Sequence, residues 1–128
     1  MNENASLFFV DRHVNSHIKE KKAFIEYGSD QKFITYGNLY EQSSKLRHFF
    51  SKFKINREDR VVILMQDVIS YPIIFWGCLK SGVIPVLLNT LLSSEVVSEI
   101  IDNSRANAVF ISSGLLSSFE NSLKKNPN

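Results

Sequence analysis

The chain has 128 residues, and its 44% hydrophobic and 22% charged content lies close to globular averages, which argues against a disordered polymer. Its length fits one ordinary domain or part of a larger one. Because 15 Lys and Arg residues stand against 13 Asp and Glu residues, the net charge of +2 argues against nucleic-acid binding.

The single cysteine, Cys78, lies in an apolar run, so we expect a buried packing role and no internal disulfide. A reducing compartment follows, and the first residues lack the basic and apolar regions of a secretion signal. We therefore expect a cytoplasmic protein.

Residues 68–92 carry one charge, Lys80, and must be weighed as a membrane span. A span needs ~20 continuous apolar residues. Here Lys80, Ser81, Gly82 and then Pro85 interrupt the run, so a buried helix followed by a buried strand is expected. Membrane association through residues 68–92 is the alternative.

The elements expected before residue 54 are a short helix, a hairpin and an amphipathic helix. Residues 5–13 form the first helix, and residues 23–27 and 32–34 form the hairpin strands around a turn at 28–30. Thr35 is expected to cap a helix over residues 36–53. Its inward face is formed by Leu39, Leu46, Phe50 and Phe53, and its outward face carries Glu41, Lys45, Arg47 and Lys52.

From about residue 60 the pattern alternates between short apolar runs and helical segments. The expected strands are residues 60–65, 83–88 and 108–111. The expected helices are residues 71–81, residues from Ser93 or Ser94 to 103, and residues 114–124. Ser70 is expected to cap the first of these helices and Gly82 to end it in the left-handed region. The expected inward residues are Val96, Val97, Ile100, Ile101, Leu115, Leu116, Phe119 and Leu123.

Right-handed crossovers turn this order into a parallel sheet. The predicted fold class is α/β: a partial parallel sheet with covering helices (β-α-β-α-β-α from about residue 60), preceded by a helix, a hairpin and an amphipathic helix. Residues 1–128 are expected to form a single segment.

Few residues of the chain have the types and spacing expected of a catalytic or ligand-binding site. No Walker-type or G-x-G-x-x-G loop occurs, and Ser112–Ser113–Gly114 is interpreted as a strand-to-helix turn rather than a phosphate site. His13 and His17, four residues apart without a third ligand, are interpreted as surface residues rather than zinc ligands. Asp67 follows a strand and could contact a substrate, but capping of the next helix is favoured.

Two motifs occur in order along the chain: residues 34–39 read ITYGNL and residues 79–86 read LKSGVIPV. They resemble the early Thr-Tyr-x-Glu-Leu and Leu-Lys-Ala-Gly-x-x-Pro-Val motifs of the adenylate-forming ligases, and residues 59–61 resemble the family's Gly-Asp-Arg-Val. Residues 72–77, 86–92, 102–106 and 111–116 look like benzoate–CoA ligases and close aryl-acid relatives. The resemblance spans nearly the whole chain but only the N-terminal portion of such an enzyme.

Three positions depart from the family pattern. Asn38 replaces the family Glu, which removes the capping-box partner of Thr35. Lys54 and Glu58 replace glycines, which suggests altered turn geometry or a relaxed constraint.

The resemblance implies a ligase reaction in which a carboxylic acid, ATP and CoA give acyl-CoA, AMP and pyrophosphate. It implies ATP, Mg²⁺ and CoA for the full-length family, whereas the phosphate loop and the C-terminal lid domain have no counterpart here. We therefore expect no catalytic, cofactor-binding or metal residue in this chain. Thr35, Tyr36, Gly82 and Pro85 are expected to act only in the fold.

The leading hypothesis is an N-terminal fragment of a benzoate–CoA-ligase-like enzyme, inactive alone, whose partner is the remainder of the ligase or a second copy in a homo-oligomer. The full-length family would take an aryl or other carboxylic acid. The alternative is a non-catalytic binding or assembly module, or a partner of a separately encoded remainder.

Overall fold

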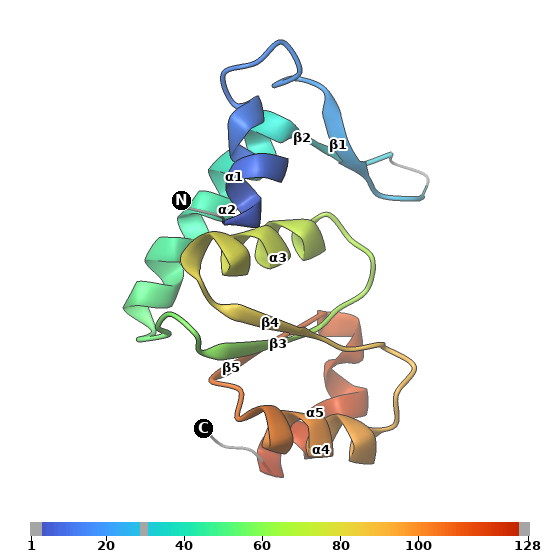
Figure 1. Ribbon diagram of the computed structural model, residues 1–128. Coiled ribbons are helices and arrows are strands. Elements are labelled where there is room, and N and C mark those ends of the chain that lie inside the picture. The colour runs from blue at the N-terminus through green and yellow to red at the C-terminus, as the bar shows by residue number, and fades with distance from the viewer. Residues whose placement is uncertain (1–3, 29–30, 126–128) are drawn as a thin grey trace.

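A three-stranded parallel sheet lies between two layers of helices in the computed structural model, which describes residues 4–28 and 31–125 (Figure 1). The strands are β3 (Arg60–Leu64), β4 (Ile84–Leu87) and β5 (Ala108–Ile111), in the order β4-β3-β5. Val62 pairs with Val86 on one side and with Val109 on the other. The predicted α/β fold with a parallel sheet is confirmed.

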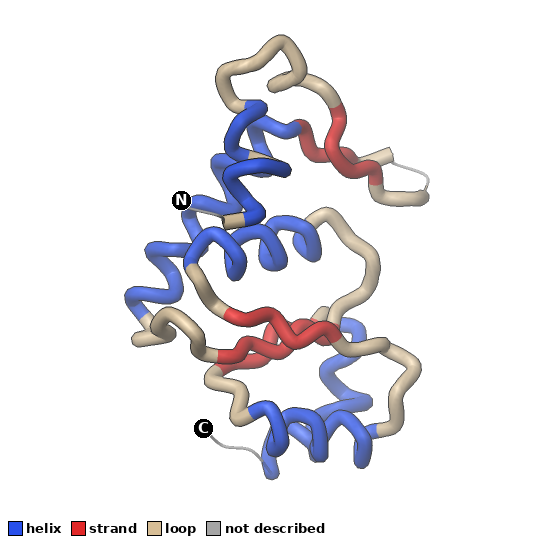
Figure 2. Tube along the Cα trace, in the orientation of Figure 1, coloured by secondary structure: helices blue, strands red, loops and turns tan. Residues whose placement is uncertain are grey.

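The helices cover opposite faces of this sheet (Figure 2). Helix α3 (Ser70–Ser81) connects β3 to β4, and helix α4 (Ser94–Ser104) connects β4 to β5 on the far side of β3. Since the two crossovers run in opposite directions along the sheet, right-handed connections place the two helices on opposite faces. Helix α2 (Tyr36–Lys52) packs beside α3, and α5 (Leu116–Lys125) packs beside α4.

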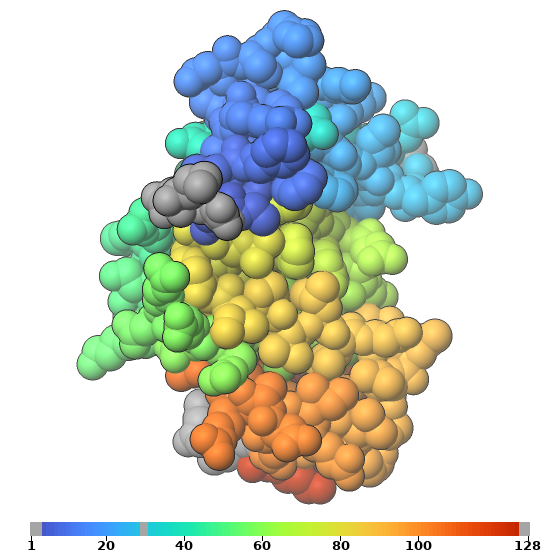
Figure 3. Space-filling view, viewed as in Figure 1, coloured from blue at the N-terminus to red at the C-terminus, as the bar shows by residue number. Residues whose placement is uncertain are grey.

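The N-terminal elements lie on the α3 side, as the blue and cyan segments of Figure 3 show. Helix α1 (Ala5–Phe9) ends four residues earlier than expected and is followed by the 3₁₀ turn η1 (Asp11–His13). Strands β1 (Lys22–Ile25) and β2 (Phe33–Thr35) form the expected antiparallel hairpin. Of its expected turn, Ser29 and Asp30 lie outside the described residues.

Lys80 ties the N-terminal segment to the rest of the molecule. Its Nζ atom lies 2.8 Å from Asp11 Oδ1, donates to Ser44 Oγ at 3.0 Å, and sits 4.0 Å from the centroid of the Tyr40 ring. The single charge of residues 68–92 therefore joins η1, α2 and α3. None of the described helices combines the length and the apolar character needed to cross a bilayer.

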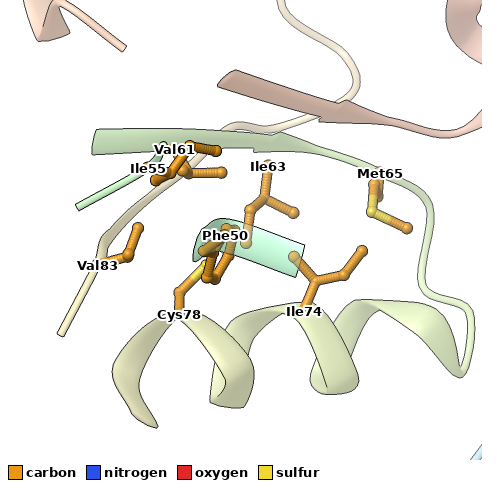
Figure 4. Close-up of a cluster of buried hydrophobic side chains, with 8 residues drawn as sticks. All are labelled: Phe50, Ile55, Val61, Ile63, Met65, Ile74, Cys78 and Val83. Atoms are coloured by element: carbon orange, nitrogen blue, oxygen red, sulfur yellow. The ribbon is translucent and has the colours of Figure 1, made fainter. Parts of the chain in front are cut away.

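Strand β3 contributes side chains to both hydrophobic clusters. Val61 and Ile63 face α2 and α3, whereas Val62 and Leu64 face α4 and α5, and all four are fully buried. Figure 4 shows the first cluster, in which Phe50 fills the space between β3 and α3. Cys78 lies in this cluster, as expected, and burial raises the pKa of its thiol to about 12.

Three residues expected to face inward are instead exposed. Phe53, at the end of α2, is 58% exposed and stacks on Phe49 beyond the edge of the sheet. Val96 is 39% exposed because Val97 and Ile101 form the inward face of α4. Leu116 is 48% exposed because the last helix begins as a 3₁₀ turn, η2 (Ser113–Leu115), which directs Leu115 inward in its place.

Thr35 caps α2 as expected, since its Oγ1 accepts a hydrogen bond from the Asn38 N–H at 3.2 Å. Helices α2 and α3 then approach each other closely at Gly77. A Cβ atom built on Gly77 would lie 2.8 Å from Leu46 Cβ, closer than real side chains come. Residues 72–77, which resemble benzoate–CoA ligases, thus contain a glycine, Gly77, whose small size sets the spacing between α2 and α3.

Gly77→Ala should destabilise the protein by about 1–3 kcal/mol, because the added methyl forces α2 away from α3. Gly114→Ala is the matched control, since its nearest neighbour would be Gln66 Oε1 at 3.9 Å. Urea denaturation of both variants measures the difference. Equal stabilities would contradict the close approach.

Two residues in the connection between α2 and β3 adopt the left-handed backbone conformation that glycine favours, although neither is glycine. Lys54 and Glu58 have φ angles of 57° and 69°, in the left-handed region. The Ile55 N–H donates to the Phe50 carbonyl, and the Lys54 N–H donates to the Ser51 carbonyl. Gly82, with φ of 73°, takes the equivalent place after α3. Both replaced positions thus adopt the left-handed backbone that glycine favours.

Lys54→Gly and Glu58→Gly should each stabilise the protein by about 0.5–1 kcal/mol. Glycine relieves a left-handed strain of about 1–2 kcal/mol but loses more entropy on folding. Gln42→Gly, at an exposed position in the middle of α2, serves as the control and should destabilise. Thermal and urea unfolding provide the measurement, and a loss of stability at both loop positions would refute the strain argument.

Candidate functional site at the carboxyl edge of the sheet

The loops that leave the three parallel strands meet at one edge of the sheet. Gln66 and Asp67 follow β3, Asn89 and Thr90 follow β4, and Ser112 follows β5. Ligands of open α/β sheets gather at this edge. It is therefore the part of the described chain where a small molecule would be expected to bind.

Ser112 joins two of these loops. Its Oγ accepts a hydrogen bond from the Gln66 N–H at 3.0 Å, and its carbonyl accepts one from the Leu115 N–H at 2.8 Å. The Asn89 side chain accepts from the Leu91 N–H at 2.9 Å. These polar groups thus hold the loops in shape, as the interpretation of residues 112–114 as a turn anticipated.

The N-terminus of α3 is capped from a distant part of the chain. Glu26, just after β1, accepts a hydrogen bond from the Ile69 N–H at 3.0 Å through its Oε2 atom. Ser70 lies inside the helix, and neither Ser70 nor Asp67 supplies the cap. The expected capping roles of Ser70 and Asp67 were therefore wrong, because a carboxylate 43 residues earlier in the chain occupies the position.

This cap also decides what the helix end can bind. A free helix N-terminus at the carboxyl edge would suit a phosphate group. Here a carboxylate already accepts from it, and a phosphate would be repelled by that negative charge. The described residues at the start of α3 therefore do not fit the triphosphate of ATP.

Two hollows open beside these loops and share Asp67, Tyr71 and Leu87. One has a volume of about 370 Å³ and is lined by the loops after β3 and β4. The other, of about 380 Å³, extends under β1 and along the start of α3. Loss of water contact, and then the negative charge of Asp67, raise the pKa of Tyr71, so its phenol stays protonated at neutral pH.

The two neighbouring histidines lie away from this edge. His17 is exposed, whereas the half-buried His13 packs against the Tyr36 ring at a centroid distance of 4.7 Å. Within residues 4–28 and 31–125, no three His, Cys, Asp or Glu side chains are grouped as a metal ion would need.

The family described as AMP-binding enzyme matches residues 10–127, and the chain belongs to this family. Over 113 residues it is 34% identical to the 4-hydroxybenzoate–CoA/benzoate–CoA ligase of Rhodopseudomonas palustris, covering 88% of this chain and 20% of that protein. Over 115 residues it is 30% identical to a long-chain-fatty-acid–CoA ligase of Haemophilus influenzae, covering 89% and 20%.

Solved structures of acid–CoA ligases also resemble this chain. The benzoate CoA ligase from Burkholderia xenovorans LB400 superposes with a TM-score of 0.79 at 26% identity, over 94% of this chain and 24% of that one. An anthranilate CoA ligase, solved in complex with anthranoyl-AMP, shares the fold with a TM-score of 0.83 at 21% identity, over 94% and 22%. The resemblance to adenylate-forming ligases is confirmed, and the chain spans 20% of the length of the curated relatives quoted above.

Glu26→Ala should destabilise the protein by about 1 kcal/mol, because it removes the only side-chain cap found on the described part of α3. Hydrogen exchange at the Ile69 amide should accelerate. Glu26→Gln should retain much of the cap through its amide oxygen, and Glu20→Ala, at an exposed carboxylate, is the control. Unchanged exchange at Ile69 in Glu26→Ala would contradict the assigned cap.

Proposed function

We propose that this chain forms the opening part of the nucleotide-activating domain of an acid–CoA ligase that acts on benzoate-like acids. The observation that carries the proposal is the superposition on a benzoate CoA ligase, which includes 94% of this chain. The sequence identity of 34% to a second benzoate-type ligase supports the same class of acid.

In the proposed enzyme, ATP and the acid form an acyl-adenylate and pyrophosphate, and CoA then displaces AMP. The chain's part in this is to build the sheet and its carboxyl edge, and none of its residues is proposed to be catalytic or to hold ATP, Mg²⁺ or CoA. The carboxylate of Glu26 supports this division, because it already accepts a hydrogen bond from the Ile69 N–H at the start of α3. We further propose that the protein acts in the cytoplasm, where ATP and CoA are available.

The partner in this proposal is the remainder of the ligase, either on the same polypeptide or encoded separately. The two outer strands of the sheet, β4 and β5, support the proposal that further chain packs against this one. Ile84 and Leu87 of β4 are 42% and 48% exposed. On the other side, Phe110 of β5 packs against the exposed ring of Phe49, which in turn stacks on the exposed Phe53. A sheet edge with apolar side chains beside it is suited to covering by further chain. The same edges would serve the alternative, a non-catalytic assembly module or a homo-oligomer.

A chimera tests the proposal. The matching segment of the benzoate CoA ligase of Burkholderia xenovorans is replaced by residues 4–125, and AMP release is measured with ATP, Mg²⁺, benzoate and CoA. The chimera should retain activity, whereas the isolated chain should release no AMP above the blank. A folded but inactive chimera, or an isolated chain that turns over, would each count against the proposal.

A further inference from the structure

The hollow beneath the hairpin, here called the apolar chamber, is lined mainly by aromatic and aliphatic side chains. Phe24 comes from β1, Leu87 ends β4, and Tyr71, Phe75 and Trp76 come from the first two turns of α3. Its volume of about 380 Å³ lies within the range of small-molecule sites. Three separate elements therefore border one open hollow next to the carboxyl edge of the sheet.

The rings suit a flat aromatic guest. Phe75 and Trp76 meet edge to face with their centroids 5.2 Å apart, and both line the chamber. Phe24 remains 42% exposed although it lines the chamber. Rings in this arrangement gain further stacking energy when another ring enters.

The charges at the chamber are of one sign. Asp67 and Glu26 both line it, and no basic side chain does so among the described residues. One oxygen of Glu26 accepts the hydrogen bond from the Ile69 N–H, whereas Asp67 is exposed. An aryl carboxylate would therefore be repelled, and a cation would be attracted.

Cationic groups are also attracted to the faces of the aromatic rings that line the chamber. An ammonium group within about 6 Å of an aromatic face is stabilised by that face. The protein already uses this contact twice elsewhere, with Lys80 over Tyr40 at 4.0 Å and Lys22 over Phe33 at 4.4 Å. The chamber combines such rings with two carboxylates but supplies no cation of its own from the described residues that line it.

We propose that the apolar chamber binds a small aromatic compound that carries an ammonium group, with the ring between Phe24 and Phe75 and the ammonium group at Asp67. The ligand chemistry is opposite to that of a benzoate-like acid, so the chamber is a second site, separate from acid activation. The inference rests on the lining of the chamber, and it concerns the chain on its own, because Leu87 also belongs to the β4 edge that the proposed remainder of the ligase would cover.

Trp76 is the only tryptophan of the chain and lines the chamber, so its fluorescence reports on occupancy directly. Benzylammonium and benzoate carry the same ring with opposite charges and are titrated separately at pH 7 and low salt. Benzylammonium should change the emission in a saturable way and bind roughly tenfold more tightly than benzoate. Salt at 0.5 M should reduce this preference through screening.

The variant Asp67→Asn should weaken benzylammonium by about two- to fivefold, as expected for one exposed ion pair, and should leave melting unchanged. Asp102→Asn, at an exposed carboxylate in α4, is the matched control and should bind like the natural chain. Equal or tighter binding of benzoate, a purely linear quenching curve with benzylammonium, or an unaltered affinity in Asp67→Asn would each overturn the proposal.

Discussion

The structure depends on one strand that is buried on both faces. Val61, Val62, Ile63 and Leu64 of β3 are inaccessible to solvent, and they divide alternately between the two hydrophobic clusters. A strand in the middle of a parallel sheet must be apolar on every side, because helices cover both faces and other strands cover both edges. Each helix layer is therefore anchored to the other through this strand.

The same arrangement creates the carboxyl edge. Since β3, β4 and β5 are parallel and in register, their ends deliver Gln66, Asn89 and Ser112 to one side of the molecule. The hydrogen bond from the Gln66 N–H to Ser112 and the cap from Glu26 to Ile69 then hold the loops and the hairpin in place. The polar groups at this edge mainly serve the chain's own backbone.

Membership of the AMP-binding enzyme family gives this architecture a context. The motif residues that resemble the family act here through shape: Thr35 starts a helix, Gly77 lets two helices approach, and Gly82 ends a helix. Each role is one of backbone geometry or packing.

Much of this architecture could be predicted from local pattern. The apolar runs of the strands, the cap at Thr35 and the stop at Gly82 act over a few residues, so their physical causes are visible in the sequence itself. The ordered motifs likewise identified the family. Lys54 and Glu58 were harder, because their left-handed backbones go with hydrogen bonds made by the surrounding backbone: Lys54 follows the end of α2, and the Glu58 N–H donates to the Gly82 carbonyl.

Side-chain direction at the ends of helices was decided only by the tertiary structure. Phe53, Val96 and Leu116 fit a helical stripe but are exposed. Phe53 lies just past the end of α2, Val97 and Ile101 form the inward face of α4, and the 3₁₀ turn η2 directs Leu115 inward instead of Leu116. The cap of α3 is the clearest case, because Glu26 and Ile69 are 43 residues apart and meet only after the hairpin folds over α3. By itself, the sequence determined the order and type of the elements and the family. The fold alone determined the acidic, ring-lined chamber, because its walls come from segments that no local pattern brings together.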